Sequence, residues 1–380
     1  MAHLRKRGDN WQITIEVGRD PVTGKRERIY ETVKGTKKEA RKRMHELAYQ
    51  VENGTYVEPS ELTMKEFMLK WYEDYCKNNL APSTQEYYEM IINSHYIPLL
   101  GNIKISDLKP MHIQSYITEK LNNGRLDGKE GGLSRKSVKR HYTVLNQILK
   151  YAVKLQVIDR NPADPISPPT PNKPEIQAMT HEELSELLEH VEGWLYDFIY
   201  IASFTGARRG ELLALRWKDV NFKEKKIQIK QSASKLSGGR LVFREPKTNS
   251  SIRPIDIDED IIKILKRRNK KQKEDRLRLG ENYNNEYDLI FVKENGNPYF
   301  PDYATKQFKK AVRKLGLEEY RLHDLRHTHA TLMLQAGVHP KIVQERLGHS
   351  SITQTLDTYS HVIPSMQKEA VQKLKNSLKK

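Results

Sequence analysis

The sequence predicts an α+β protein of several domains: a small three-stranded β-sheet plus a helix, an all-α helical bundle, and a mixed, mainly α domain with a small antiparallel sheet. The chain has 380 residues, enough for two or three domains of ordinary size. Strand-like segments occur near the N-terminus and after residue 226, and helical periodicity fills the region between. Six prolines between Pro162 and Pro174 form an extended run. We therefore expect domains at 1–57, 60–165 and 178–380, with a proline-rich linker at 166–177.

The charge of the chain points to a polyanionic partner. The formal net charge is +17 and the sequence pI is about 9.5. Nucleic acid is the commonest partner for such a surplus, although a merely basic, soluble protein is the alternative. The single cysteine, Cys76, rules out an intramolecular disulfide and fits a reducing cytoplasm. No signal peptide and no apolar stretch of about 18 residues is present, so we expect no membrane association.

The N-terminal domain begins with strand-like alternation at residues 11–17, a turn-rich segment at 18–24 and a partner strand at 26–33. Thr36 and Glu39 form a capping box at the start of a helix with one apolar stripe. A small sheet backed by one helix could place basic side chains in a DNA groove, and a solvated basic face explains them equally well. The arginines concerned are Arg5, Arg7, Arg19, Arg26 and Arg28.

The middle domain reads as helical throughout. Thr63 and Glu66 form a second capping box, and Ser83 is the expected cap of the next helix. Further helices are expected at 111–121 and 135–155, the latter with a continuous apolar side. The first turns of this last helix carry basic residues that could contact phosphates or form a solvated face: Arg135, Lys136, Lys139 and Arg140.

The C-terminal domain opens with a third capping box, Thr180 with Glu183. An apolar helix then runs to Gly206, where the backbone can turn sharply, and Arg208 begins the next helix. Backbone geometry would hold an arginine there firmly, which suits a guanidinium aimed at a phosphate. Glu211, one turn on, could pair with and orient an arginine. For Arg208 alone, an ordinary surface salt bridge is the alternative.

A strand-rich section follows, with strands expected at 226–231, 240–245, 251–257 and 288–292. Lys247 lies at the tip of a hairpin between the second and third of these strands. A lysine there is ordinarily exposed and inert. It could instead be carried into a site and donate a proton near a phosphate.

The stretch from residue 323 to residue 359 carries the richest chemistry. His323 and Arg326, three apart, share one helix face and can point at a single anion. His349 follows, and Tyr359 comes ten positions later. Two arginines can neutralise the oxygens of a scissile phosphate, a tyrosine can attack the phosphorus, and histidines can move the proton of the nucleophile. The predicted catalytic set is Arg208, Lys247, His323, Arg326, His349 and Tyr359.

A metal site is the competing interpretation of this stretch. His323 and His327 are four apart, as in the zinc-protease motif His-Glu-x-x-His, but the acid between them is Asp324. A zinc site would also leave Arg208, Lys247, His349 and Tyr359 without roles. No Walker-type glycine loop is present either. We therefore expect neither a metal nor another cofactor.

Four segments resemble the tyrosine recombinases, the phage-integrase family. They are TGARRGELLALRW (205–217), PKTNSSIRPI (246–255), HDLRHTHAT (323–331) and LGHSSITQTLDTYSHV (347–362). The resemblance spans the C-terminal domain in order, and no catalytic position departs from the family pattern. By architecture, the two N-terminal domains resemble the arm-binding and core-binding domains of the family.

The resemblance implies roles for the catalytic set. Tyr359 would form a 3′-phosphotyrosine and free a 5′-hydroxyl, while Arg208 and Arg326 clamp the phosphate. Lys247 would protonate the leaving oxygen, and His323 would act as general acid and base.

It also implies that His349 hydrogen-bonds the phosphate, and we interpret His327 as structural. Members of the family work as tetramers on double-stranded DNA and exchange strands through a Holliday junction. An arm-binding domain indicates the integrase of a phage or integrative element, working in the bacterial cytoplasm at the nucleoid. An excisionase and a host DNA-bending protein are possible partners.

The segment after Tyr359 has an apolar residue every four positions from Met366 to Leu378, which predicts an amphipathic helix. In the family such a tail docks on a neighbouring protomer, and docking on its own domain is the alternative.

Two other functions would use part of the predicted catalytic set and the basic charge. A type IB topoisomerase-like enzyme shares the chemistry, and a DNA-binding regulator would have a silent site.

Overall fold

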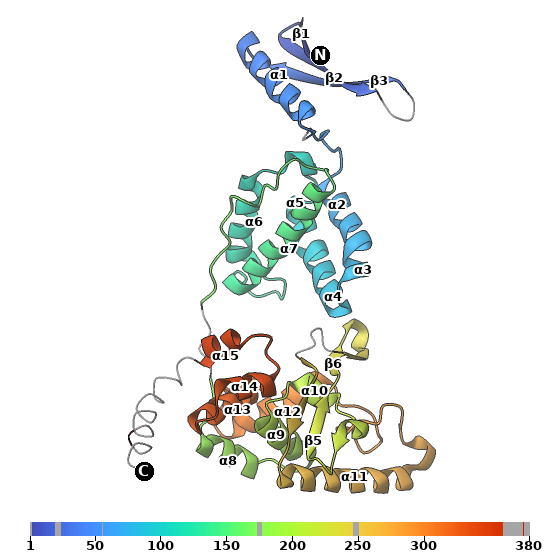
Figure 1. Ribbon diagram of the computed structural model, residues 1–380, viewed down its shortest axis with the longest axis vertical. Coiled ribbons are helices and arrows are strands. Elements are labelled where there is room, and N and C mark those ends of the chain that lie inside the picture. The colour runs from blue at the N-terminus through green and yellow to red at the C-terminus, as the bar shows by residue number, and fades with distance from the viewer. Residues whose placement is uncertain are drawn as a thin grey trace. The chain divides into compact units, whose positions relative to one another are not determined.

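The computed structural model describes residues 2–19, 24–54, 56–172, 177–245, 251–359 and Lys375. The chain divides into two compact units, Met1–Lys173 and Pro174–Lys380 (Figure 1). The division falls within the segment predicted as a linker.

The first unit begins with an antiparallel sheet in the order β1-β2-β3, followed by α1. These elements are β1 (Ala2–Arg7), β2 (Asn10–Arg19), β3 (Arg26–Lys34) and α1 (Lys37–Glu52). Ile13 and Ile15 of β2 are buried together with Leu47 of α1, so one face of the sheet packs against the helix. Thr36 and Glu39 make both hydrogen bonds of the capping box, which confirms that predicted helix start.

The rest of the first unit is a helical bundle (Figure 1). Its elements are α2 (Met64–Trp71), the π-helical turn η1 (Tyr72–Cys76), α3 (Lys77–Asn79), α4 (Pro82–Ile91), the π-helical turn η2 (Ile92–Tyr96), α5 (Ile97–Leu100), the short 3₁₀ turn η3 (Ile105–Asp107), α6 (Pro110–Asn123) and α7 (Arg135–Lys154). The predicted cap at Ser83 is wrong. Ala81 is the N-cap and Pro82 takes the first helical position, because its missing N–H costs nothing there.

The bundle core contains the aromatic residues of the early helices and the apolar side of α7. Trp71 and Tyr96 are almost fully buried, as are Leu145 and Ile148. The Tyr96 hydroxyl donates to the backbone carbonyl of His141, which fixes the crossing of η2 over α7. These aromatics therefore stabilise the bundle.

The second unit contains eight helices in the part of the chain that the structure describes. They are α8 (His181–Glu189), α9 (Gly193–Thr205), α10 (Arg209–Leu213), α11 (Glu259–Leu279), α12 (Pro301–Lys314), α13 (Asp324–Gln335), α14 (Pro340–Leu347) and α15 (Ile352–Tyr359), with short 3₁₀ turns at η4 (Trp217–Asp219), η5 (Ser237–Gly239) and η7 (Gly280–Asn282). Apart from Asp197, helix α9 is mainly apolar, and it contributes Phe198, Ile199, Ile201 and Ala202 to the core. Consequently it places the turn after Thr205 among α10, α13 and α14.

Two small antiparallel sheets complete the second unit, one in the order β4-β5-β8 and the other the pair β6-β7. Their strands are β4 (Val220–Asn221), β5 (Lys226–Ile229), β6 (Ser232–Lys235), β7 (Leu241–Arg244) and β8 (Arg253–Asp256). The predicted strand at 288–292 is wrong, since only isolated bridges form there, at Leu289 and Val292. Successive residues Ile290 and Phe291 are both completely buried, so this apolar run fills the core without a ladder of hydrogen bonds.

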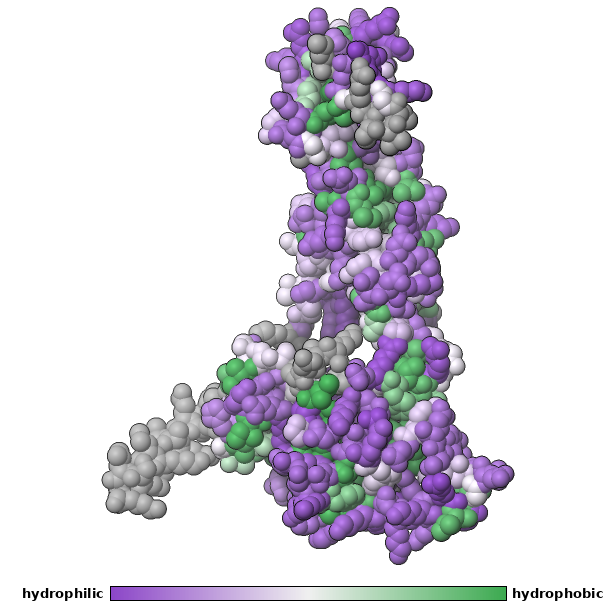
Figure 2. All heavy atoms as spheres, turned by 45° about the vertical axis from the view of Figure 1, so that its right-hand side comes forward, coloured by the Kyte–Doolittle hydropathy of each residue, from purple (hydrophilic) through white to green (hydrophobic). Residues whose placement is uncertain are grey.

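The surface is largely polar. Figure 2 shows hydrophilic residues covering most of the visible face, with hydrophobic ones in scattered groups. In the described ranges, no helix combines the length and the apolar character needed to cross a bilayer.

Candidate active site

The site is organised by the turn between α9 and α10. Gly206 has φ 64°, the left-handed region that favours glycine. A Cβ on Gly206 would lie 2.6 Å from Cδ2 of His329 and 2.7 Å from Cδ2 of Leu347. The turn therefore packs directly on α13 and on the end of α14, and no side chain fits between them.

Arg208 is the N-cap residue of α10, as the sequence predicted. Its backbone N–H donates to Oε2 of Glu211 at 2.9 Å, and its Nη1 donates to Oε1 of the same carboxylate at 2.8 Å. The Arg208 side chain is 37% exposed, whereas that of Glu211 is 4% exposed. Glu211 thus holds the guanidinium from below while leaving part of it open to solvent.

The second partner of Glu211 is Arg253 of β8, which the sequence interpretation did not assign to the site. Nη2 of Arg253 lies 3.0 Å from Oε2 of Glu211, and both side chains are about 5% exposed or less. Burial raises the pKa of Glu211, but the charges and hydrogen bonds of Arg253 and Arg208 outweigh it and hold the pKa below its ordinary value. The sequence did contain a signal for Arg253, because this residue occupies an inward-facing position of the strand predicted at 251–257.

Loss of this carboxylate should destabilise the second unit. In Glu211→Ala, Arg253 remains buried without its counter-charge, which costs about 3–5 kcal/mol. For a unit of this size that lowers Tm by roughly 10 °C. Calorimetric unfolding of the full chain measures the shift. The exposed Glu189 of α8 provides the matched control, Glu189→Ala, and equal Tm values for the two variants would contradict a stabilising bridge.

Arg326 of α13 is 3% exposed and bridges two carbonyl groups. Its Nη1 donates to the carbonyl of Gly206 and its Nη2 to that of Leu347, each at 2.8 Å. Burial and the neighbouring charge of Arg208 lower the pKa of Arg326 to about 9. The positive charges of Arg208 and Arg326 therefore repel each other. Two cations held this close together suit an anion that both of them bind.

The predicted histidines belong to the same cluster. His323 is the N-cap residue of α13, and burial together with His327 and Arg326 lowers its pKa to about 4. Nδ1 of His349 lies 2.9 Å from the hydroxyl of Thr355, and burial next to Arg326 and Arg208 lowers its pKa to about 3. Both imidazoles are therefore neutral near pH 7.

Tyr359, the last residue of α15, is completely buried. Its hydroxyl lies 2.9 Å from Nδ1 of His327, and the His327 ring is 5.2 Å from that of His323. Burial raises the pKa of Tyr359 to about 12, although the nearby charge of Arg326 lowers it. The structure thus brings together five of the six predicted residues, and Lys247 lies outside the described residues. It also gives His327, interpreted from sequence as structural, a contact with the tyrosine hydroxyl.

Comparison with known proteins assigns the chain to a family. Residues 177–366, half of the chain, match the Phage integrase family, and residues 63–121 match the Phage integrase, N-terminal SAM-like domain. The chain belongs to the phage integrase family. It is similar to a tyrosine recombinase XerC-like protein of Caldanaerobacter subterraneus subsp. tengcongensis, with 30% identity over 98% of this chain and 97% of that protein. It is also similar to the ICEBs1 integrase of Bacillus subtilis, with 29% identity over the full length of both. The protein is therefore a site-specific recombinase of the tyrosine type.

Solved integrase structures share its fold. The Tn1549 transposon integrase in complex with a circular intermediate DNA superposes with a TM-score of 0.68 and 22% identity, over 83% of this chain and 100% of that one. A lambda integrase dimer bound to a COC′ core site gives a TM-score of 0.56 and 17% identity, over 94% of each chain. The helix-rich architecture with small antiparallel sheets is thus that of the tyrosine integrases.

The basic residues predicted to contact DNA lie on surfaces of the recombinase. In the N-terminal sheet the arginines alternate with residues packed on α1, so they lie on the opposite, exposed face. Those described there are Arg5, Arg7, Arg26 and Arg28. Arg28 and Arg26 lie 3.1 and 3.7 Å from the Glu16 carboxylate, and the side chain of Arg19 lies outside the described residues. On α7 the exposed set is Arg135, Lys136, Lys139 and Arg140.

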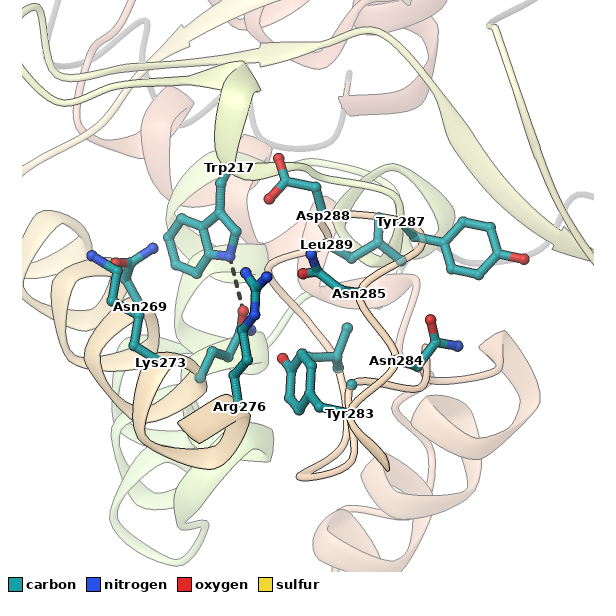
Figure 3. Close-up of a pocket in the computed structure, with 13 residues that line it drawn as sticks. Trp217, Asn269, Lys273, Arg276, Tyr283, Asn284, Asn285, Tyr287, Asp288 and Leu289 are labelled. Atoms are coloured by element: carbon teal, nitrogen blue, oxygen red, sulfur yellow. Dashed lines mark hydrogen bonds between the residues drawn. The ribbon is translucent and has the colours of Figure 1, made fainter. Parts of the chain in front are cut away.

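A separate polar pocket lies beside α11 (Figure 3). Trp217 and Tyr283 line it together with Lys273 and Arg276, and Nε1 of Trp217 donates to Oε1 of Gln272 at 2.9 Å. Of the predicted catalytic residues that the structure describes, none lines this pocket. The pocket is therefore distinct from the cluster around Tyr359.

Proposed function

We propose that the recombinase integrates and excises a mobile element by cutting DNA with Tyr359. The observation that carries this proposal is the cluster itself. A buried tyrosine hydroxyl lies beside a buried arginine, Arg326, whose charge acts on it, and Arg208 acts on the same arginine. Such an arrangement suits a phosphodiester whose charge must be held while a nucleophile attacks.

In the proposed cleavage step, Tyr359 loses its proton to a base of the cluster, its oxygen forms a bond to phosphorus, and the bond to the 5′-oxygen breaks. Arg208 and Arg326 neutralise the non-bridging oxygens, with His349 as a further hydrogen-bond donor. Lys247 protonates the departing 5′-oxygen, and His323 is positioned to move protons within the site. Attack by a 5′-hydroxyl from a second DNA site reverses these events, so that no nucleotide cofactor is consumed.

We further propose that double-stranded DNA is bound by all three domains, with 1–57 on arm sites and 60–165 on core sites. The net charge of +17 and the exposed arginines of the sheet support this assignment. A lambda integrase tetramer has been solved bound to a Holliday junction, with a TM-score of 0.58 and 16% identity to this chain. We propose the same assembly here, in the bacterial cytoplasm at the nucleoid, with an excisionase and a host DNA-bending protein as possible partners.

A nicked suicide substrate tests the proposed function. If cleavage releases a short fragment that diffuses away, the wild-type protein stays attached to the DNA and migrates as a covalent adduct. The absence of an adduct on the attachment-site DNA would contradict the enzymatic assignment and favour a silent DNA-binding regulator. Recombinant product from two sites separates a recombinase from a type IB topoisomerase-like enzyme, which would relax supercoils without exchange.

The tail after Tyr359 lies outside the described residues, apart from Lys375. Because its apolar residues recur every four positions, we propose that it docks on a neighbouring protomer. Deleting the chain beyond Ser365 should then reduce recombination at least tenfold while DNA affinity changes less than threefold. Gel-shift and two-site recombination assays measure the two effects, and an equal loss of both would contradict docking in trans.

A further inference from the structure

The partner of the Tyr359 hydroxyl is a residue without an assigned role. Among the described residues, the hydrogen bond of this hydroxyl is to Nδ1 of His327, at 2.9 Å. Tyr359 is 0% exposed, so bulk water does not reach its oxygen in this arrangement. The tyrosine oxygen therefore shares its hydrogen bond with an imidazole nitrogen.

A tyrosine in this setting needs a proton acceptor. A phenol is a weak nucleophile until its proton leaves, and general bases act only from hydrogen-bond distance. Burial raises the pKa of Tyr359 to about 12, so the phenolate is rare near neutral pH. Proton transfer during the attack is thus worth far more here than at an exposed tyrosine.

The other two histidines of the cluster are engaged differently. Nδ1 of His349 lies 2.9 Å from the Thr355 hydroxyl. His323 meets the edge of the His327 ring, with centroids 5.2 Å apart and planes at 88°. Of the three histidines, His327 is the one whose ring nitrogen lies within hydrogen-bond distance of the tyrosine oxygen.

The ionisation of His327 suits this role. Burial lowers the pKa of His327, the Asp324 carboxylate raises it, and the positive charges of Arg326 and Arg321 lower it further. The net shift is downward, so the ring is neutral near pH 7. A neutral imidazole has one acceptor nitrogen and one N–H. The hydroxyl donates to Nδ1 in the tautomer that carries its ring hydrogen on Nε2, and this is the tautomer that the inference uses.

We propose that His327 is a further catalytic residue, which takes the proton of Tyr359 during DNA cleavage and returns it on rejoining. The inference rests on the function proposed above. In the step, the O–H bond of Tyr359 breaks and an N–H bond forms at Nδ1 of His327. The tyrosine oxygen bonds to phosphorus as the bond to the 5′-oxygen breaks, and that oxygen receives its proton from Lys247. The imidazolium that forms is stabilised by the buried Asp324 carboxylate of the same helix.

Two substitutions separate proton transfer from positioning. His327→Asn can place an amide oxygen near the position of Nδ1 and accept the same hydrogen bond, but it cannot take up a proton. His327→Ala removes both abilities. Single-turnover cleavage of the nicked substrate by the full chain should fall at least 100-fold in both variants, within the usual range for a general base. Gel-shift affinity and Tm, measured in parallel, show that each variant is folded and binds DNA.

A substrate with a sulfur in place of the bridging 5′-oxygen identifies the proton that is moved. A thiolate leaves without protonation, so this substrate bypasses the need for a general acid. Both His327 variants should remain at least 100-fold slower than wild type on it, because their defect lies in the nucleophile. Recovery on the sulfur substrate would overturn the inference and place His327 on the leaving-group side.

The remaining outcomes are equally decisive. Cleavage by His327→Asn within threefold of wild type would overturn proton transfer and leave only a positioning contact. If wild type itself forms no adduct, the proposed function fails, and this is read from the wild-type lane alone. An adduct in wild type with unchanged rates in both variants overturns only the role of His327.

Discussion

Tyr359→Phe should form no covalent adduct with DNA and give no recombinant product, while its affinity for attachment-site DNA stays within about twofold of wild type. The substitution removes the oxygen that is proposed to bond to phosphorus and keeps the ring. That ring is packed in a small core with Leu334, Val343 and Leu347, so the helices around it remain in place. Denaturing gels after incubation with the nicked substrate measure the adduct directly.

The stability of this variant is a second readout. Loss of the hydrogen bond to His327 costs about 0.5–1.5 kcal/mol, a shift of a few degrees in Tm. Tyr320→Phe is the matched control, because the Tyr320 hydroxyl donates to the Glu183 carboxylate at 2.9 Å in the same unit. That control should cleave at the wild-type rate. An adduct in Tyr359→Phe would show that another residue is the nucleophile.

Arg326→Lys should slow single-turnover cleavage by about 10²–10³-fold, the usual effect of removing one group that stabilises developing charge. The guanidinium binds the carbonyls of Gly206 and Leu347 with two of its nitrogens and still presents N–H groups to an anion. A lysine offers a single charged nitrogen, so it cannot hold both carbonyls and a phosphate in one fixed geometry. Each carbonyl left without a donor costs about 1–3 kcal/mol, so Tm should fall as well.

Arg346→Lys is a suitable control for this loss. Arg346 also donates to a carbonyl, that of Phe204 at 2.9 Å, and to Nε2 of His329 at 3.2 Å. It resembles Arg326 in chemistry but belongs to no predicted catalytic set. Its replacement should lower Tm while leaving cleavage within about threefold. Equal cleavage by Arg326→Lys and wild type would show that a single positive charge suffices at this position.

Helix starts could be predicted from the sequence because their signals are local. The capping boxes at Thr36, Thr63 and Thr180 each depend on two residues three apart, and all three form as predicted. The two wrong predictions, a strand at 288–292 and a helix cap at Ser83, show the limit of local signals. An apolar run is compatible with a strand or with a buried irregular segment, and only tertiary packing decides between them.

The cluster around Tyr359 was predictable in composition but not in its contacts. Arg208, His323, Arg326, His349 and Tyr359 could be grouped from sequence because their chemistry is complementary. The ion pair of Arg253 with Glu211 and the contact of His327 with Tyr359 join residues 42 and 32 positions apart. No short-range pattern specifies such pairs, because they depend on how β8 and α15 pack against the turn after α9.

Gly206 ties the chemistry of this enzyme to its folding in one residue. Its carbonyl holds Arg326, and its missing side chain is the space in which His329 and Leu347 meet. Any substitution there would push two helices apart and release the arginine at the same time. Any variant of this enzyme that keeps both its fold and its chemistry must therefore keep glycine at position 206.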